Sequence, residues 1–487
     1  MRITNIMMSN AMLLNIRRNM AYVDKLYGQI STAKKIQVPS DDPIIATRAL
    51  KFRSNVAETA QYQRNTSQGM AWMDVTEGAY NNIVNIMKSI KDRCVEAANG
   101  TLEAVDRQAI ATQIRQMERQ LGTEMNITYA GRYTFSGFRT NEPPVFVEDN
   151  NKYYSITQSF TVDDIEKTKS YQKLDINMPL GTDPPLVYDT CILKLPYSNA
   201  VITSIRGYDA AANSYTYDVV TASANMPSIT QGTGEWTDSA NPYDSANIPL
   251  RTIVHIKETG ELVMNASDAA AFIPARLDVA YEKQGFRAGE LNPIVYFNCT
   301  DKNTGKNYTM DTQDIAYEFS TNTDVNINSL AKNVYTDKMY ADLNHLCNLL
   351  ERVVLSNPNQ LTGKYSNPPY SLSGDVLAQT VNRQIADERA MLSDILHNRF
   401  NNMLYMCDRH IANVSREQTD LGARMNRLDL ISTRLAQDEG SYKKLMSDNE
   451  DTDMMESIMY KSNAEAVYQA SLKAGASIIQ MTLSNFI

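Results

Sequence analysis

The chain has 487 residues, of which 43% are hydrophobic and 21% are charged, and its formal net charge is −9. This composition is ordinary for a folded protein, and the length predicts about three domains. The negative balance argues against nucleic acid and an anionic membrane surface as partners. Apolar runs stay shorter than the roughly 20 residues that a membrane helix needs. The N-terminus does not have the pattern of a cleavable signal peptide.

Both ends of the chain predict helices that need partners. Residues 3–16 carry no charge, and neither do the residues after Lys473. On both end helices, apolar residues recur at spacings of three and four, which is typical of a helix seam. On the first helix they are Leu13, Ile16, Met20, Val23, Tyr27 and Ile30, and on the last helix they are Val467, Ala470, Ala474, Ile478 and Met481. We expect these side chains to form the assembly interface of an oligomer.

A short extended link is predicted between two N-terminal helices. The first helix covers residues 5–32, and residues 39–43 then read Pro-Ser-Asp-Asp-Pro. Asp42 is a good N-cap, and Pro43 suits the first position of a helix. The helix that follows runs to about residue 98, where Asn99-Gly100 ends it, and another runs to about residue 126. Such a length predicts a rod-like bundle.

The composition changes near residue 141 and stays rich in Tyr, Thr, Asn, Pro and Gly to about residue 330. Short alternating runs separated by turn signals predict strands there. These runs are residues 152–160, 215–220, 252–256 and 294–298, and residues 131–137 predict an earlier strand or hairpin arm. A helix over 337–355 and a linker at 357–369 follow.

Helix returns at residues 375–446, an acidic break covers 447–453, and a last helix runs from 454 to the end. The expected fold is therefore mainly α with a β-rich insert that projects from a long helical bundle. Residues 1–38 and 454–487 form a terminal helical hairpin, residues 39–140 and 371–453 form the bundle, and residues 141–370 form the insert of one or two domains.

Residues that could carry chemistry lack a catalytic or metal-binding pattern. No two of the five cysteines have CxxC spacing, and the sequence contains no HExxH motif. Buried thiols and packing or surface histidines are the simpler interpretation, and helix capping explains Asp41 and Asp42. The acidic residues 448–453 lack the loop spacing of a calcium site. We predict no catalytic residue, no metal and no cofactor, and hence no enzyme.

Several motifs in the first 140 residues resemble the flagellin superfamily. They are the start Met1-Arg2-Ile3-Thr4, the Pro-Ser-Asp-Asp-Pro run, Asn99-Gly100-Thr101, and the Gly-Arg-Tyr-Thr-Phe-Ser-Gly run at 131–137. Within that superfamily the chain is similar to the hook-associated proteins of the hook–filament junction. The helix pattern extends the resemblance to about residues 370–487.

The resemblance implies a structural axial protein of the extracellular bacterial flagellum, exported without signal cleavage by the flagellar type III system. It would polymerise as a homo-oligomer ring between hook and filament, with the terminal helices as an inner tube. Its other partners would be neighbouring hook-associated proteins, flagellin, and a cytoplasmic export chaperone on the C-terminal helix. The five cysteines depart from the family, whose extracellular members tend to lack cysteine.

Two alternatives stay open at this point. The chain could be flagellin, the main filament subunit, although the Pro-Ser-Asp-Asp-Pro run argues for the junction. It could also be an extracellular adhesin or glycan-binding protein, with exposed tyrosines and Trp236 of the insert as the binding residues.

Overall fold

A computed structural model describes most of the chain, in two compact units. The described residues are 5–98, 104–171, 187–209, 214–218, 228–232, 252–257, 259–264, 276–310, 313–320, 323–352, 358–368 and 370–484. The predictions at Asn99-Gly100-Thr101 and Trp236 lie outside them. One unit comprises Met1–Gln68, Glu318–Val325 and Arg427–Ile487, and the other comprises Gly69–Tyr317 and Asn326–Asn426.

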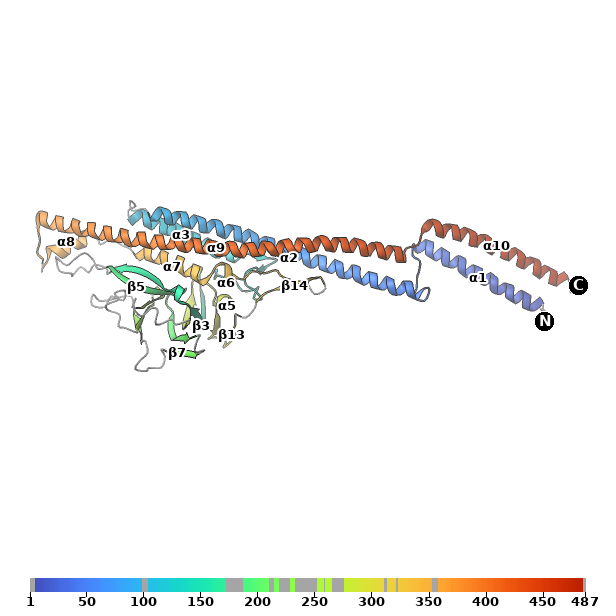
Figure 1. Ribbon diagram of the computed structural model, residues 1–487, viewed down its shortest axis with the longest axis horizontal. Coiled ribbons are helices and arrows are strands. Elements are labelled where there is room, and N and C mark those ends of the chain that lie inside the picture. The colour runs from blue at the N-terminus through green and yellow to red at the C-terminus, as the bar shows by residue number, and fades with distance from the viewer. Residues whose placement is uncertain are drawn as a thin grey trace. The chain divides into compact units, whose positions relative to one another are not determined.

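The two ends of the chain pair as helices in the first unit. Helix α1 (Asn5–Thr32) runs antiparallel to α10 (Met454–Ser484), so that the two chain termini lie at the same end of the pair (Figure 1). We call this pair the terminal hairpin. The predicted first helix is confirmed, and so is the start of the last helix at Met454.

The link after α1 ends in the predicted cap. Asp42 Oδ1 accepts hydrogen bonds from the backbone N–H groups of Ile44 (3.0 Å) and Ile45 (3.1 Å), which begin helix α2 (Pro43–Ala97). Asp41 Oδ2 accepts from the N–H of Gln37 at 3.0 Å. Both carboxylates therefore satisfy backbone donors that a helix start and a turn would otherwise leave without partners.

A second connection joins α10 to the long helix α9 (Gly374–Glu450). Residues 447–450 are still helical, so the predicted acidic break at 447–453 is too long, and only residues 451–453 leave the helix. Asp453 Oδ1 caps α10 by accepting from the N–H groups of Met455 and Glu456. Asp453 alone is enough to cap the start of α10, so residues 447–450 are not needed for the break and remain part of α9.

The two connections are tied together in the first unit. Ala33 has a positive φ of 57°, which turns the chain out of α1. The N–H of Thr452 then donates to the Ala33 carbonyl at 3.0 Å, and the N–H of Lys35 donates to the Glu450 carbonyl at 2.6 Å. Arg53 adds a two-pronged contact to the Glu450 carboxylate, at 2.7 and 2.6 Å.

The second unit combines helices with sheets. Its shorter helices are α3 (Ala104–Met125), α5 (Pro293–Tyr296), α6 (Ala331–Val334), α7 (Asp337–Arg352) and α8 (Pro358–Ser366), with one 3-10 turn, η1 (Val162–Asp164). Helix α7 contacts both α3 and strand β5, so it lies between helices and sheet (Figure 1).

The described strands form two larger sheets and two small pairs. The six-stranded sheet has the order β13 (Asn307–Tyr308), β12 (Asn298–Asp301), β3 (Asn150–Phe160), β11 (Arg276–Phe286), β6 (Val201–Asp209), β7 (Ser214–Asp218). The five-stranded sheet has the order β4 (Glu166–Tyr171), β5 (Val187–Lys194), β10 (Glu261–Met264), β9 (Thr252–Ile256), β8 (Ser228–Gly232). The pairs are β1 (Thr128–Tyr129) with β2 (Arg132–Tyr133), and β14 (Ala316–Ser320) with β15 (Thr323–Asn326).

The β-rich insert is confirmed, with three local corrections. Residues 294–298 are not a strand, because Pro293 begins the short helix α5 and only Asn298 enters β12. Residues 358–366 are helix α8 rather than linker, and Leu361 and Tyr365 bury themselves against Val381 of α9. The predicted arm at 131–137 stops at Tyr133.

A tight turn explains that third correction. Ala130 and Gly131 both have positive φ, 49° and 77°, which is the two-residue hairpin turn that joins β1 to β2. The chain then leaves the pair and buries Phe135 edge-on against Tyr80 of α2, with ring centroids 5.9 Å apart. Burying the Phe135 ring stabilises the fold more than extending β2 by two residues would.

The division into terminal hairpin, bundle and insert at residues 38, 140, 370 and 453 stays a prediction. Among the described residues, no helix combines the length and the apolar character needed to cross a lipid bilayer.

Candidate functional site: the terminal hairpin

The terminal hairpin closes along one narrow seam. On α1 one line of half-buried and buried positions steps by four and three, and its residues are Met12, Ile16, Asn19, Val23, Leu26 and Ile30. On α10 the matching positions are Ser457, Lys461, Ala464, Tyr468, Ser471 and Gly475. This spacing is that of a coiled-coil seam. Small and polar residues dominate the α10 side, so the pair buries little apolar surface.

Close packing and two polar contacts fix the register of the seam. Gly475 faces Met12 and Ile16, and a Cβ added there would lie 3.3 Å from the end of each side chain. Asn19 Nδ2 donates to Ser471 Oγ at 2.9 Å. The Lys461 ammonium lies 4.2 Å from the centre of the Tyr27 ring, a cation–π contact.

The predicted interface residues of α1 divide between the seam and solvent. Ile16, Val23 and Ile30 lie in the seam. Leu13, Met20 and Tyr27 are 48%, 59% and 56% exposed. Since these three are seven residues apart, they follow one line along α1 beside the seam. The predicted coiled-coil pattern therefore combined two neighbouring lines of residues on α1. Packing against α10 buries one line and leaves the other exposed.

On α10 the three predicted residues whose side chains are described lie outside the seam. Val467 is 54% exposed, and Ala470 and Ala474 are also exposed. The side chains of Ile478 and Met481 lie outside the described residues. We call Leu13, Met20, Tyr27, Val467, Ala470 and Ala474 the flank residues. Whether they contact a neighbouring subunit stays a prediction.

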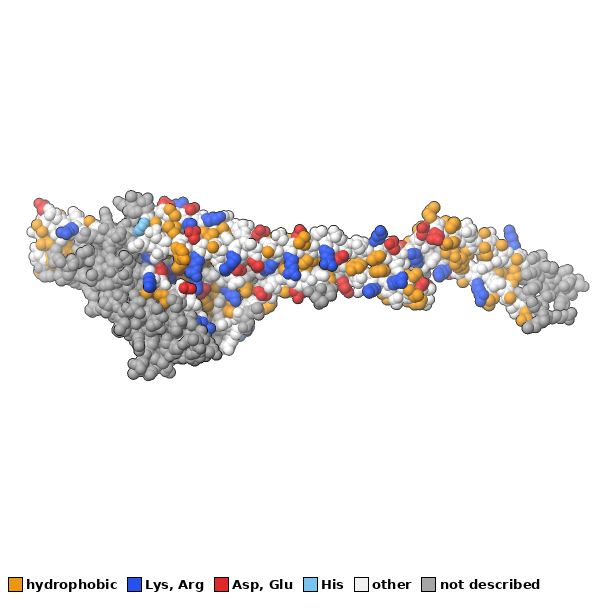
Figure 2. Space-filling model, viewed as in Figure 1, with side chains coloured by type: hydrophobic (Ala, Val, Ile, Leu, Met, Phe, Trp, Pro, Cys, Tyr) orange, Lys and Arg blue, Asp and Glu red, His pale blue; other side chains and the backbone are white. Residues whose placement is uncertain are grey.

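Further apolar side chains are exposed on both helices. Figure 2 shows hydrophobic side chains over the described part of the terminal hairpin, interrupted by a few charged ones. Those at least 40% exposed beyond the flank residues are Met7, Leu14, Tyr22, Met454, Met455, Ile458, Met459, Tyr460 and Leu472. Single exposed apolar residues are common, but so many on one helix pair are typical of surfaces that bind protein.

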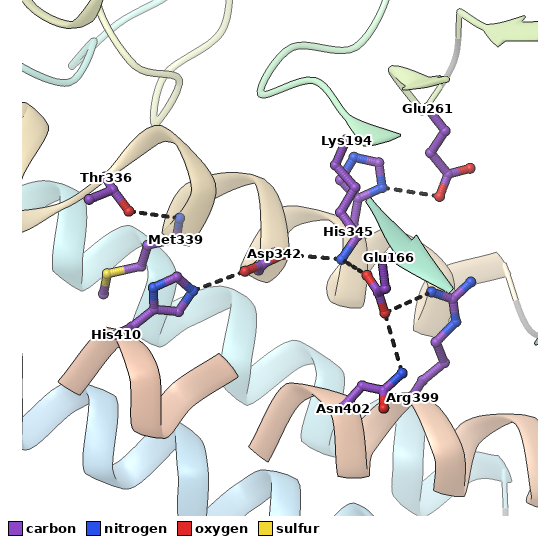
Figure 3. Close-up of polar contacts among 10 residues, drawn as sticks. All are labelled: Glu166, Lys194, Glu261, Thr336, Met339, Asp342, His345, Arg399, Asn402 and His410. Atoms are coloured by element: carbon purple, nitrogen blue, oxygen red, sulfur yellow. Dashed lines mark hydrogen bonds and ion pairs between the residues drawn. The ribbon is translucent and has the colours of Figure 1, made fainter. Parts of the chain in front are cut away.

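A second candidate is a buried ion network in the other unit (Figure 3). It consists of Glu166 on β4, Lys194 on β5, Asp342 on α7, and Arg399 and His410 on α9. Lys194 Nζ contacts Glu166 and lies 3.1 Å from Asp342 Oδ1. The other Asp342 oxygen lies 2.9 Å from His410 Nε2, and Arg399 lies 3.5 Å from Glu166.

The network is balanced in charge. Its two carboxylates face two permanent cations, so the formal charges cancel when His410 is neutral. Burial opposes ionisation of Asp342, but the Lys194 charge and the His410 hydrogen bond hold the pKa of Asp342 below its ordinary value. Burial also opposes the charge of Lys194, yet Asp342 and Glu166 raise the pKa of that ammonium. The network joins a sheet to α7 and α9.

No local sequence signal predicts this network, because each member looks ordinary in its own segment. The sequence pattern places His345 and His410 among packing or surface histidines, and both are buried. His345 Nδ1 lies 3.2 Å from Glu261 Oε1. His255 is buried in β9, and burial lowers the pKa of His255 to about 4. No group of three His, Cys, Asp or Glu in the described part of the chain is placed to hold a metal ion.

Comparisons with known proteins relate the terminal hairpin to a family. Residues 3–140 match the profile of the bacterial flagellin N-terminal helical region, and residues 404–487 match that of the bacterial flagellin C-terminal helical region. Both terminal regions of the chain are therefore similar to the helical regions of bacterial flagellin. The paired helices α1 and α10 are the outer ends of these two matched regions.

Curated relatives in the family include flagellar hook-associated protein 3 of Escherichia coli K12, 31% identical over 160 residues. The same protein of Salmonella typhimurium is 31% identical over 162 residues. Each match covers 33% of this chain and 50% or 51% of the relative, so the chain spans about half the length of these relatives. The flagellin of Salmonella montevideo is 26% identical over 210 residues, 42% of this chain and 38% of that protein.

Solved structures of flagellar proteins also align with the chain. Flagellar hook-associated protein 3 of Legionella pneumophila aligns with 81% of this chain and 98% of its own, at 12% identity and a TM-score of 0.31.

Proposed function

We propose that this chain is a structural axial protein of the bacterial flagellum that assembles as a junction ring between hook and filament. Two observations support the proposal. Flagellin-family regions form both ends of the chain, and the relatives at 31% identity carry the name hook-associated protein 3, whereas the named flagellins are 24–26% identical. The Pro-Ser-Asp-Asp-Pro link at residues 39–43 favours the same choice.

The observation that carries the proposal is the pairing of these two ends into one thin hairpin with exposed apolar residues on both helices. A helix pair that buries so little of its apolar surface gains stability when neighbours cover the rest. In this proposal the flank residues, together with Ile478 and Met481, contact neighbouring copies, and the hairpins line the inside of a tube.

The proposal includes partners and location. Copies of this chain form the ring, and neighbouring hook-associated proteins and flagellin stack on its two faces. Before export, a cytoplasmic chaperone covers the C-terminal helix, whose exposed apolar residues would otherwise bind other chains. The chain then leaves the cell through the flagellar export system and becomes part of the extracellular flagellum.

Deletion of the gene tests the proposal by electron microscopy of the cells and by detection of flagellin in the medium. We expect hooks without filaments and flagellin released into the medium, because the filament lacks its base. Expression of the intact chain from a plasmid should restore filaments. A filament of normal length in the deletion strain would contradict the junction function.

The position of the protein separates the junction from the flagellin alternative. Gold-labelled antibody against residues 141–370 should mark one narrow band at the hook end of each filament. Labelling along the whole filament would instead identify the chain as the main subunit.

A further inference from the structure

Three of the five cysteines meet at one level of the helical part of the second unit. Cys94 lies on α2, Cys347 on α7 and Cys407 on α9, and all three are fully buried. The Cys94 thiol is hydrogen-bonded to Cys407, and Cys347 is near enough to interact with it electrostatically. Cys191 and Cys299 lie in different sheets.

The register of α2 against α9 places Cys94 within two residues of the level of Cys407, independently of the thiols. Gln418 Nε2 donates to Asn81 Oδ1 at 2.9 Å, and the Lys91 ammonium lies 2.5 Å from Asp408 Oδ1. The two contacts are ten residues apart on each helix, and the numbers rise along α2 while they fall along α9, so the helices run antiparallel in register. Cys94 lies three residues and Cys407 one residue from the second of these contacts, and both are fully buried, so the two thiols lie at nearly the same level.

We propose that Cys94 and Cys407 are a disulfide site that joins the N-terminal and C-terminal helical regions covalently when the chain folds under oxidising conditions. The bond would link α2 to α9 across 312 intervening residues, counted between positions 94 and 407. Cross-links that close long loops restrict the unfolded chain most, so this bond should raise stability. The inference does not depend on the proposed place in the flagellum.

The oxidant is a low-molecular-weight disulfide. One cysteine thiolate attacks this disulfide, forms a mixed disulfide and releases one thiol. The second cysteine thiolate then attacks the protein sulfur of the mixed disulfide and releases the second thiol. Two protein thiols lose two electrons and two protons in total, and the oxidant gains them as two free thiols.

Burial determines when the bond can form. The hydrogen bond with Cys407 and burial raise the pKa of the Cys94 thiol well above its usual range, so little thiolate exists in the folded chain. Neither sulfur is exposed to an oxidant. Exchange therefore takes place while the chain folds, before α2 and α9 close over the thiols, and reduced folded protein should oxidise slowly.

The test refolds the full chain from denaturant, with a mixture of reduced and oxidised glutathione or with a reductant alone. Free thiols are then blocked with iodoacetamide, and peptides are mapped by mass spectrometry without reduction. We expect a cross-linked peptide pair that contains Cys94 and Cys407, alkylated Cys191, Cys299 and Cys347, and a melting temperature several degrees above that of the reduced protein. Five alkylated cysteines after oxidative refolding would overturn the proposal, as would a bond between Cys94 and Cys347.

Two variants serve as matched controls. Cys347→Ala removes the neighbouring buried thiol and should leave the cross-link and its shift in melting temperature. Cys407→Ala should abolish both. If Cys407→Ala does not fold, the peptide map of the unmodified chain still decides the proposal.

Discussion

Buried charges in this protein are stabilised by partners from distant parts of the sequence. Asp342 is held by Lys194 and His410, which lie on a strand and on another helix. Such a group is costly when one partner is removed, because the remaining charge stays buried without compensation. The same logic applies at smaller scale to Glu450, which is 2% exposed and contacts Arg53 and Lys34.

Replacement of Asp342 tests the ion network. Asp342→Asn should lower the free energy of unfolding by about 3–5 kcal/mol, because two buried cations, Lys194 and Arg399, then share Glu166 as the one carboxylate of the network. Lys194→Met in the same chain should recover part of that loss. Urea unfolding of the unmodified chain, the two single variants and the double variant measures the coupling free energy between Asp342 and Lys194.

An exposed ion pair provides the control for that cycle. Asp420→Asn removes one ion pair of Arg424, but the Asp420 side chain is 66% exposed, so the expected cost is about 0–1 kcal/mol. Equal costs for Asp342→Asn and Asp420→Asn would show that the network does not stabilise the fold.

The pH dependence of stability tests Glu450. Its hydrogen bond with Arg53, together with Lys34, lowers the pKa of Glu450 below the ordinary 4.5 although burial opposes this. The unfolded chain therefore binds the proton more tightly, and the stabilisation is present above pH 4.5 and is lost as pH falls through the folded pKa. Glu450→Gln should cost about 1–3 kcal/mol at pH 7 and much less at pH 3.

Urea titrations at the two pH values measure this difference. Glu465→Gln is the matched carboxylate control, because the Glu465 side chain is 44% exposed, and it should show a smaller effect at pH 7. A cost of Glu450→Gln that does not change with pH would argue against an ionised Glu450 in the folded chain.

At the scale of elements, the terminal hairpin depends on one glycine. Gly475→Leu would push Met12 and Ile16 away from α10, since even a Cβ would lie 3.3 Å from both side chains. We expect this change to destabilise the pairing of α1 and α10 by about 1–3 kcal/mol. Hydrogen exchange should become faster in both helices and stay unchanged in β3 and β11.

Another helical glycine separates packing from helix propensity. Gly440 of α9 has no atom within 4 Å of an added Cβ. Gly440→Leu should therefore be neutral or slightly stabilising, because leucine favours helix over glycine by about 0.8 kcal/mol. Faster exchange in the terminal hairpin with Gly440→Leu as well would mean that the seam does not depend on close packing.

At the scale of the whole molecule, assembly should depend on residues that the monomer does not need. Met20 is 59% exposed, so Met20→Glu should leave the melting temperature of the monomer unchanged. In the proposed ring the Met20→Glu change would bury a charge against a neighbouring subunit, so it should abolish filaments. Ile478→Asp, near the C-terminus, should have the same effect.

Motility and electron microscopy of cells that carry these variants measure assembly, and Lys25→Glu is the control at an exposed charged position of α1. Normal filaments with both Met20→Glu and Ile478→Asp would argue against burial of the flank residues in a tube.

Local signals determined most of the helical architecture from the sequence. The spacing of apolar residues located α1, α2, α3, α7, α9 and α10, and Asp42 before Pro43 located the start of α2, because helix periodicity and capping involve residues only a few positions apart. Composition and alternation located the β-rich insert. Motifs within residues 1–140 were enough to suggest the family, which the comparisons then supported at both ends.

Contacts between distant residues were decided by the tertiary structure alone. The coiled-coil pattern of α1 included Leu13 and Met20 as well as Ile16 and Val23, and only the position of α10 decides which pair is buried. Helix α8 formed where prolines predicted a linker, because it packs on α9. Asp342 with His410, and Cys94 with Cys407, are 68 and 313 positions apart, computed from their numbers. No local rule relates residues so distant, since only packing of whole elements brings them together.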